Sequence, residues 1–384
     1  MNSKSSVFPG RLGIQQRVLP TYRVDFFDLL AQACEDGLCI FAGDVQPQES
    51  IPTTSDLKVA EFVESRNYHF RDVQSSYYFL WQGGLINWLE NWKPDVLVVE
   101  ANPRYLSTNK GIQWMHARGK PVIGWGLGAP LIDSPKSPGG RINKDFRSYL
   151  RGRMLKRLDG LIAYSHKGAR EYKEIAFPQQ PVYVASNAVA KHPKGSPLER
   201  STHFNGRPVV LFVGRIQTRK RIDILLRACS ALPEILQPML WIVGDGPMKE
   251  NLELLASEIY PKAKFTGRKG GGELASIFQK ADLFVLPGTG GLAVQEAMSY
   301  ALPVIVAEGD GTQGDLVKPE NGWLIPPNDE QALRETLILA LSNPARLRQM
   351  GKCSYQIVQD EVNIEQMVAT FLNAINDSAL TGTG

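Results

Sequence analysis

The sequence predicts an α/β protein built from two doubly wound, Rossmann-like domains that face a cleft. Short apolar runs rich in β-branched residues alternate with amphipathic segments along most of the chain, which is typical of parallel sheets covered by helices. This alternation stops once, in a polar segment, and then restarts. The length of 384 residues also suits two domains at roughly 150 residues each.

In the first half, the strand candidates are short runs of Val, Ile and Leu that are long enough for a buried strand but too short for a helix. They are Leu12–Val18, Leu38–Ala42, Val96–Val99, Pro121–Gly124, Gly160–Tyr164 and Val182–Ala185. Segments with helical periodicity separate most of them: Asp25–Cys34, Tyr78–Trp92, Tyr105–Arg118, Ile142–Leu158 and Lys167–Lys173. Residues 43–57 contain Pro and several polar residues and are expected to form a loop.

The polar segment 187–207 holds Pro, Gly, Asn and Ser, which favour an interdomain linker. We therefore expect an N-terminal domain over 1–190, a linker over 191–206 and a C-terminal domain over 207–360. The last helices, at about 360–384, are expected to pack back onto the first domain.

In the second half the same alternation predicts five further strands and seven helices. The strands are Val209–Val213, Met239–Val243, Ala263–Thr266, Leu283–Leu286 and Pro303–Val306. The helices are Arg221–Ala231, Met248–Ser257, Glu273–Lys280, Leu292–Tyr300, Glu330–Leu341, Pro344–Gln359 and Ile364–Ile375.

Composition excludes several classes of protein. No apolar run reaches the ~18 residues of a membrane-spanning helix, Met1 to Ser6 lack an apolar leader, and the formal net charge of +4 is too small to indicate nucleic-acid binding. The four cysteines show no C-x-x-C spacing, which favours a reducing cytoplasmic location without structural zinc.

Positive charge is concentrated in one part of the first half. Residues 101–173 carry 15 basic and 4 acidic side chains, so one face is expected to attract anions. Segment 136–157 reads as a basic amphipathic helix. We expect it to pack on the sheet; the alternative is a peripheral contact with the inner face of a membrane.

The first motif with chemical meaning lies at the end of the strand Val209–Val213. Gly214 permits a sharp exit, Arg215 follows, and Lys220 stands at the start of the next helix. A helix N-terminus, the donor fork of an arginine and the point charge of a lysine together suit a diphosphate. Two solvated surface charges are the plainer alternative.

A second motif, Gly288-Thr289-Gly290-Gly291-Leu292, joins a strand to a helix. Its backbone N–H groups could bind phosphate or sugar oxygens. Glu296 lies on the first turns of that helix, where a carboxylate could accept hydrogen bonds from a ribose. A helix-start glutamate that only favours the macrodipole is the alternative.

The same segment fits a rival function. Gly288 to Ala293 match the dinucleotide pattern G-x-G-x-x-A, and Glu308 follows at the spacing of its ribose-binding acid. An NAD(P)-dependent oxidoreductase is therefore an alternative, although it leaves Arg215 and Lys220 without a role.

Six ordered motifs of the second half resemble the retaining GT-B glycosyltransferases of family 4. They are VGRIQTRK, WIVGDGPM, FTGRK, ADLFVLPG, GGLAVQEAMSYALPVIV and NGWLIPPND. The resemblance implies a nucleotide-diphosphate sugar and an acceptor hydroxyl. We expect a UDP-linked hexose, with glucose ranked ahead of mannose and N-acetylglucosamine. The resemblance assigns the diphosphate to Arg215 and Lys220 as catalytic residues, and donor contacts to Gly214, Arg268, Lys269, Leu274, Gly290, Gly291, Leu292 and Glu296.

The first half resembles the family at RVLPTYRVDFF, ANPRYLST and PVIGWGLG. These motifs imply an acceptor side with Tyr22, Asn102, Arg104 and Leu127. Two positions depart from the family pattern: Gly288 stands where many members have a Glu that contacts the hexose, and Leu127 lies in a loop where many have a His. A non-catalytic nucleotide-sugar-binding module is therefore a further alternative.

No cofactor and no metal are expected. Many nucleotide-sugar enzymes hold a divalent cation with an Asp-x-Asp pair, and the sequence contains no such pair.

Overall fold

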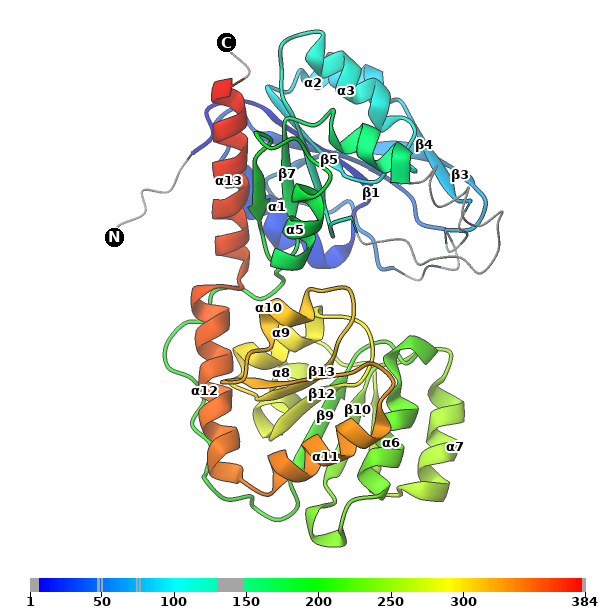
Figure 1. Cartoon of the computed structure of the whole chain (residues 1–384), viewed down its shortest axis with the longest axis vertical. Helices are drawn as coiled ribbons and strands as arrows, with labels where there is room; N and C mark the ends of the chain where they lie inside the picture. The colour runs from blue at the N-terminus through cyan, green and yellow to red at the C-terminus, as the bar shows by residue number, and fades with distance from the viewer. Residues whose placement is uncertain are drawn as a thin grey trace. The chain divides into compact units, whose positions relative to one another are not determined.

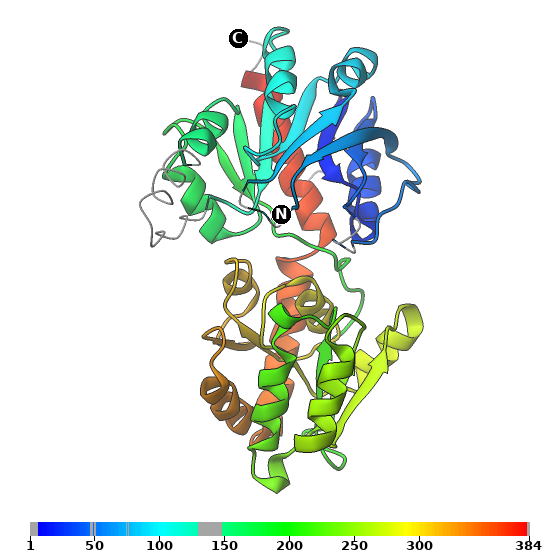
Figure 2. The same ribbon diagram turned by 90° about the vertical axis from the view of Figure 1, so that its right-hand side faces the viewer.

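The computed structural model describes residues 7–46, 49, 51–73, 75, 77–129 and 148–381. The chain divides into two compact units, one formed by Met1–Ser186 with Ile364–Gly384 and the other by Asn187–Asn363. Each unit has its own parallel sheet with helices on both faces (Figures 1 and 2).

The sheet of the first unit has the order β4-β3-β2-β1-β5-β6-β7-β8, and its pairs are parallel apart from β3 with β4. The strands are β1 Leu12–Val18, β2 Leu38–Gly43, β3 Glu61–Phe70, β4 Phe79–Gly83, β5 Val96–Glu100, β6 Val122–Gly126, β7 Gly160–Ala163 and β8 Val182–Val184. β2 and β7 are buried throughout, and β1 and β5 nearly so, as their continuous apolar sequences predict for strands covered on both faces.

Two sets of helices cover this sheet. α1 (Val24–Gln32) and the C-terminal α13 (Ile364–Thr381) pack together on one face, and Figure 1 shows α13 in red beside α1. α2 (Leu85–Trp92), α3 (Thr108–His116), α5 (His166–Lys173) and a helix over 148–155 share the core of the other face. The last helix of the chain is thus part of the first unit's core.

The predicted helix Tyr78–Trp92 is wrong in its first part, because Phe79–Gly83 forms β4. β4 pairs antiparallel with β3, and its side chains alternate between buried and half-buried. β3 itself was not predicted: it is mostly exposed, with Ser65 its one buried residue, so it carries no apolar signal.

Only part of the predicted basic helix 136–157 lies in the described residues, since 130–147 are outside them. Within the rest, Met154 and Leu155 are buried against the unit. No helix in the described ranges combines the length and apolarity needed to cross a membrane.

The sheet of the second unit has the order β11-β10-β9-β12-β13-β14, and its pairs are all parallel. The strands are β9 Val209–Val213, β10 Met239–Val243, β11 Ala263–Gly267, β12 Leu283–Leu286, β13 Val304–Ala307 and β14 Gly322–Ile325. The edge strand β14 was not predicted, because four residues with two of them half-buried or exposed give little pattern.

The helices of this unit are α6 Ile222–Ser230, α7 Lys249–Ile259, α8 Gly271–Lys280, α9 Leu292–Ser299, α10 Gln313–Leu316, α11 Glu330–Leu341 and α12 Pro344–Asp360. α6 packs against α7 and α11, whereas α9 packs against α12, and Phe278 of α8 stacks on Tyr300 at the end of α9.

The division between the units falls at Ser186/Asn187, so the segment 191–206 expected as a linker is grouped with the second unit. Arg200 explains this grouping. Its guanidinium donates to the carbonyls of Phe278, Ala281, Tyr300 and Ala301, at the C-terminal ends of α8 and α9.

Candidate donor and acceptor sites

The strand order of the second sheet reverses between β9 and β12, and ligands of such sheets bind at the carboxyl ends of the strands at this switch point. Gly214 to Lys220 follow β9, and Pro287 to Leu292 follow β12. The two motifs singled out in the sequence therefore lie at the same place on the sheet.

Lys220 joins the two motifs. It ends the short 3-10 helix Thr218–Lys220, and its Nζ donates to the Thr289 carbonyl at 2.6 Å. Its Cε lies 3.8 Å from the position of a Cβ on Gly214. Burial and the neighbouring Arg219 lower the pKa of Lys220 to about 8, although Asp310 acts in the opposite direction.

Two glycines make this approach sterically allowed. A Cβ on Gly288 would lie 2.2 Å from the Arg219 carbonyl oxygen, and Gly290 has φ +135° with its Cβ position 2.4 Å from Lys220 Nζ. The Thr289 N–H also donates to the Arg219 carbonyl at 3.1 Å. The close packing of the loop against the 219–220 turn therefore accounts for Gly288 and Gly290 without a dinucleotide.

The loop after β13 completes this edge and was not predicted. Gln313 is 1% exposed and donates to the Gly290 carbonyl at 2.9 Å, while its Oε1 is buried without a hydrogen-bond partner among the described residues. Thr312 lies against Gly291, and its hydroxyl is 2.7 Å from Asp310. A lone Gln in a Gly-rich loop gives no recognisable sequence signal.

Glu296 lies on α9, one turn after Leu292. It is half-buried, burial raises its pKa, and its carboxylate has no hydrogen bond or ion pair to any residue that the structure describes. A half-buried carboxylate without partners is available to a ligand that supplies hydroxyl donors.

The other predicted donor residues lie after β11, which is two strands away from β9 in the sheet. Arg268 is exposed, Lys269 pairs with Glu273 at 2.9 Å, and Leu274 packs on the core from α8. The Gly244 N–H donates to the Gly267 carbonyl and so links this loop to the loop after β10. Arg215 is exposed at the end of β9.

Because Lys220 is cationic only below about pH 8, its charge predicts a pH dependence. Binding of a nucleoside diphosphate should weaken as pH rises through about 8, since the diphosphate prefers the protonated amine. The effect on stability has the opposite sign. The pKa of Lys220 in the folded protein lies below its ordinary value of 10.5, so the free energy of unfolding should rise as the pH increases from about 8 to 10.5.

Titrating a nucleoside diphosphate between pH 6.5 and 9.5 measures this effect. Lys220→Arg should remove the fall in affinity, because an arginine stays charged over that range. A fall of equal size in Lys220→Arg would assign the titration to another group.

In the first sheet the order reverses between β1 and β5. Arg17 near the end of β1 meets Glu100 at the end of β5: its backbone N–H donates to Glu100 at 2.6 Å, and its guanidinium donates to Glu49 at 2.6 Å. Burial would lower the pKa of Arg17, but the nearby Glu49, Tyr105 and Glu100 outweigh this effect, so the pKa is raised overall. For Glu100, burial is the largest effect and raises the pKa of the carboxyl group.

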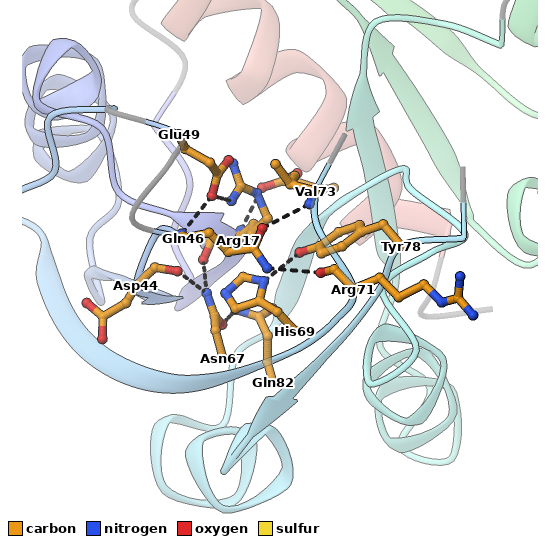
Figure 3. A network of polar contacts seen from close by, with 11 residues as sticks. Arg17, Asp44, Gln46, Glu49, Asn67, His69, Arg71, Val73, Tyr78 and Gln82 are labelled. Carbon is orange, nitrogen blue, oxygen red and sulfur yellow. Dashed lines mark hydrogen bonds and ion pairs between the residues drawn. The ribbon is translucent and has the colours of Figure 1, made fainter. Parts of the chain in front are cut away.

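A wider polar network surrounds Arg17 (Figure 3). Asn67 donates to the Arg17 and Asp44 carbonyls, both at 2.8 Å, and Gln82 donates to Asn67 at 3.1 Å. His69 Nδ1 lies 2.9 Å from the Tyr78 hydroxyl. The network fixes the backbone at the ends of β1, β2 and β3, and Glu100 is its half-buried carboxylate at the switch point.

Arg23 is buried near the same edge with only 3% exposure and no carboxylate within ion-pair distance among the described residues. Its guanidinium carbon lies 4.7 Å from the Trp125 ring centroid and 5.6 Å from that of Tyr164. Cation–π contacts of this kind stabilise a desolvated guanidinium. Neither Arg23 nor Glu100 was among the predicted site residues. Glu100 could have been found from the sequence, because an acidic residue at the end of an apolar strand indicates a candidate site residue.

Of the predicted acceptor residues, only Asn102 and Arg104 contact each other, with Arg104 donating to the Asn102 side chain. Tyr22 is 42% and Leu127 45% exposed, on loops after β1 and β6. All four follow strand ends at the carboxyl edge of the first sheet.

Comparison with known proteins gives matches to part of the second unit and to the fold of the chain. Residues 198–357 match the family model "Glycosyl transferases group 1". The chain is 37% identical over 129 residues to sulfoquinovosyl transferase SQD2 of Arabidopsis thaliana and 40% identical over 125 residues to a GDP-mannose-dependent alpha-mannosyltransferase of Mycolicibacterium smegmatis. Each match covers 32% of this chain, and 24% and 31% of the relative, so the chain matches about a quarter to a third of their length.

Solved structures share the fold over nearly the whole chain. Sucrose-phosphate synthase from Thermosynechococcus elongatus has a TM-score of 0.69 at 18% identity and covers 97% of this chain and 100% of its own. Alr3699/HepE of Anabaena, solved in complex with UDP, has a TM-score of 0.68 at 14% identity, covering 96% and 99%. Residues 198–357 therefore match the family model of glycosyl transferases group 1, within a chain that has the GT-B fold of these solved structures.

Proposed function

We propose that the protein is a retaining glycosyltransferase that moves a hexose from a nucleoside-diphosphate sugar to an acceptor hydroxyl. The observation that carries this proposal is the position of Lys220 at the second unit's switch point, against the Gly288–Gly290 loop and within the family-matched segment. A cation beside the N-terminus of α9 suits a diphosphate leaving group.

In the proposed reaction the bond between the sugar's anomeric carbon and the diphosphate oxygen breaks first. The acceptor oxygen then attacks from the same face, and its proton passes to the departing phosphate. Lys220 and Arg215 stabilise the negative charge that develops on the diphosphate. Glu296 accepts hydrogen bonds from the nucleotide ribose, and Arg268, Lys269 and Leu274 border the base. The product therefore keeps the donor's anomeric configuration.

The donor is proposed to be UDP-linked, with glucose as the hexose. A related structure is described in complex with UDP-glucose, whereas several relatives are named as GDP-mannose-dependent. A panel of UDP- and GDP-sugars with candidate acceptors, read by nucleoside diphosphate release and product mass, tests both. Transfer from any of these donors supports the proposal, and binding without transfer to any acceptor would support the non-catalytic module.

Donor binding should depend on Glu296. In Glu296→Gln the side chain keeps its shape but loses its charge, and a charge-assisted hydrogen bond contributes roughly 1.5–3 kcal/mol. We expect the Kd of the nucleoside diphosphate to rise about tenfold or more by isothermal titration calorimetry. Glu308→Gln is the matched control, since Glu308 follows the neighbouring strand β13. Equal affinities in both variants would show that Glu296 does not contact the donor.

Transfer should not require a divalent metal. The proposed site already places Lys220 and Arg215 beside the diphosphate, and a cation there would be repelled by both. Activity should survive thorough EDTA treatment, measured as the initial rate of nucleotide release. Loss of activity that Mg²⁺ or Mn²⁺ restores would contradict this, and Asp310 and Asp315 would be the first ligands to test.

A further inference from the structure

The Gly-rich loop between β12 and α9 is held from two sides. β12 lies between β9 and β13 in the sheet. From the turn after β9, the Lys220 amine donates to the Thr289 carbonyl at 2.6 Å. From the loop after β13, the Gln313 side chain donates to the Gly290 carbonyl at 2.9 Å. Two successive carbonyl groups of the loop are thus bound by side chains that follow its two neighbouring strands.

The bond from Gln313 also sets the direction of the next N–H group. In a planar trans peptide, the C=O of one residue and the N–H of the next point in opposite directions. Because the Gly290 carbonyl is turned toward Gln313, the Gly291 N–H is turned away from it, toward the side of the loop on which Lys220 lies. Gly291 is the half-buried N-cap residue of α9, and its N–H makes no hydrogen bond to any residue in the described ranges. This N–H is therefore available to an anion beside Lys220.

The Gln313 side chain is an unfavourable choice for stability alone. It is 1% exposed, and its Oε1 has no hydrogen-bond partner in the part of the chain that the structure describes. The amide lies against the backbone of Gly309, where a Cβ would be 3.2 Å from both Oε1 and Nε2. A buried amide oxygen without a donor destabilises a fold, and an apolar side chain of similar shape would avoid this. The contribution of the glutamine is therefore its donation to Gly290.

We propose that Gln313 is a positioning residue for donor binding: by holding the Gly290 carbonyl, it directs the Gly291 N–H at the diphosphate of the nucleotide. This inference rests on the proposed function, in which the carboxyl edge of the second sheet binds a nucleoside-diphosphate sugar. Gln313 acts without touching the ligand, since its oxygen is buried and its nitrogen is bonded to the loop. Without that bond the 290–291 peptide can rotate, and a carbonyl oxygen turned toward the diphosphate repels it.

The test compares Gln313→Met with Gln295→Met in the full chain. Methionine has nearly the length of glutamine but cannot donate a hydrogen bond. Gln295 is the matched control because it is also a buried glutamine bonded to backbone, at 3% exposure. Its amide donates to the Asn187 carbonyl at 2.8 Å and accepts from the Val189 N–H at 3.1 Å, so it does not hold the Gly-rich loop. Three quantities are measured: the Kd of UDP and of GDP by calorimetry, the temperature of thermal unfolding, and hydrogen–deuterium exchange at 290–292.

For the nucleotide that the wild type binds more tightly, we expect the Kd to rise about threefold to tenfold in Gln313→Met, the effect of one hydrogen bond. The slower exchange that this nucleotide causes at 290–292 in the wild type should be lost. The unfolding temperature should change little, because the unpaired oxygen disappears together with the bond to Gly290. Gln295→Met should show the reverse, a lower unfolding temperature with an unchanged Kd. A merely structural role for Gln313 would instead lower the unfolding temperature, as in the control.

Equal affinity and equal protection in Gln313→Met and the wild type would overturn the proposal, and so would an equal loss of affinity in Gln295→Met. If Gln313→Met does not fold, the wild type decides: protection of 214–220 by the bound nucleotide without protection of 290–292 would overturn the proposal as well. Failure of the wild type to bind either nucleotide would contradict the proposed function, and the inference with it, whereas the other outcomes contradict the inference alone.

Discussion

Replacing Lys220 with alanine should lower kcat/KM about tenfold to a hundredfold or more. The amine donates to the Thr289 carbonyl and is poised beside the Gly-rich loop, where the diphosphate is proposed to bind. A charge-assisted hydrogen bond is worth roughly 1.5–3 kcal/mol, and stabilisation of charge that develops in the transition state lowers the barrier directly. Arg215→Ala should act in the same direction. Initial rates of nucleoside diphosphate release measure both.

Lys220→Arg should retain part of the activity, because it keeps the charge but not the geometry. Lys249→Ala is the control for removing a lysine elsewhere in the unit, since Lys249 lies on α7 and pairs only loosely with Glu253. Near-normal kcat/KM in both Lys220→Ala and Arg215→Ala would contradict their assignment.

The second large effect is expected at Gly288. Gly288→Ala places a Cβ 2.2 Å from the Arg219 carbonyl oxygen, so the 219–220 turn has to move and the Lys220–Thr289 contact has to change with it. Forcing atoms into such a packed position costs about 1–3 kcal/mol. Thermal unfolding of the second unit should therefore shift downward, by roughly 2–4 °C per kcal/mol, and donor affinity should fall as well.

Gly272→Ala is the matched control, because a Cβ there meets no atom within 4 Å. It lies in α8, where alanine is favoured over glycine. If Gly288→Ala were as stable as Gly272→Ala and bound donor normally, the close packing of the loop on the 219–220 turn would be refuted.

The parallel strands could be predicted because burial on both faces demands continuous apolar sequence. β9 and β12 have this property, and their bounds agree with the prediction. β3 and β14 do not have it. β3 is largely exposed, and two of the four residues of β14 are half-buried or exposed, so the positions of both strands depend on pairing with their neighbours. β4 was mistaken for helix because a short apolar run fits both periods.

In the candidate site, Arg215, Lys220 and Glu296 could be proposed from the sequence, because each lies at or soon after a junction between an apolar strand and a helix. Gln313 and Arg17 could not be found this way, because they belong to the site through contacts with residues 23 and 32 positions away. Arg23 is a similar case: only the fold brings Trp125 and Tyr164 over its guanidinium. Such residues are defined by packing rather than by local pattern.

The central claim is that the carboxyl edge of the second sheet binds the nucleoside diphosphate of a sugar donor. Hydrogen–deuterium exchange of the full chain, with UDP-glucose, GDP-mannose or NADH at equal concentration, tests it most directly. The account predicts slower exchange of the amides at 214–220 and 288–296 with at least one nucleotide sugar, and no protection there with NADH. Protection of these two loops by NADH but by neither nucleotide sugar would contradict it.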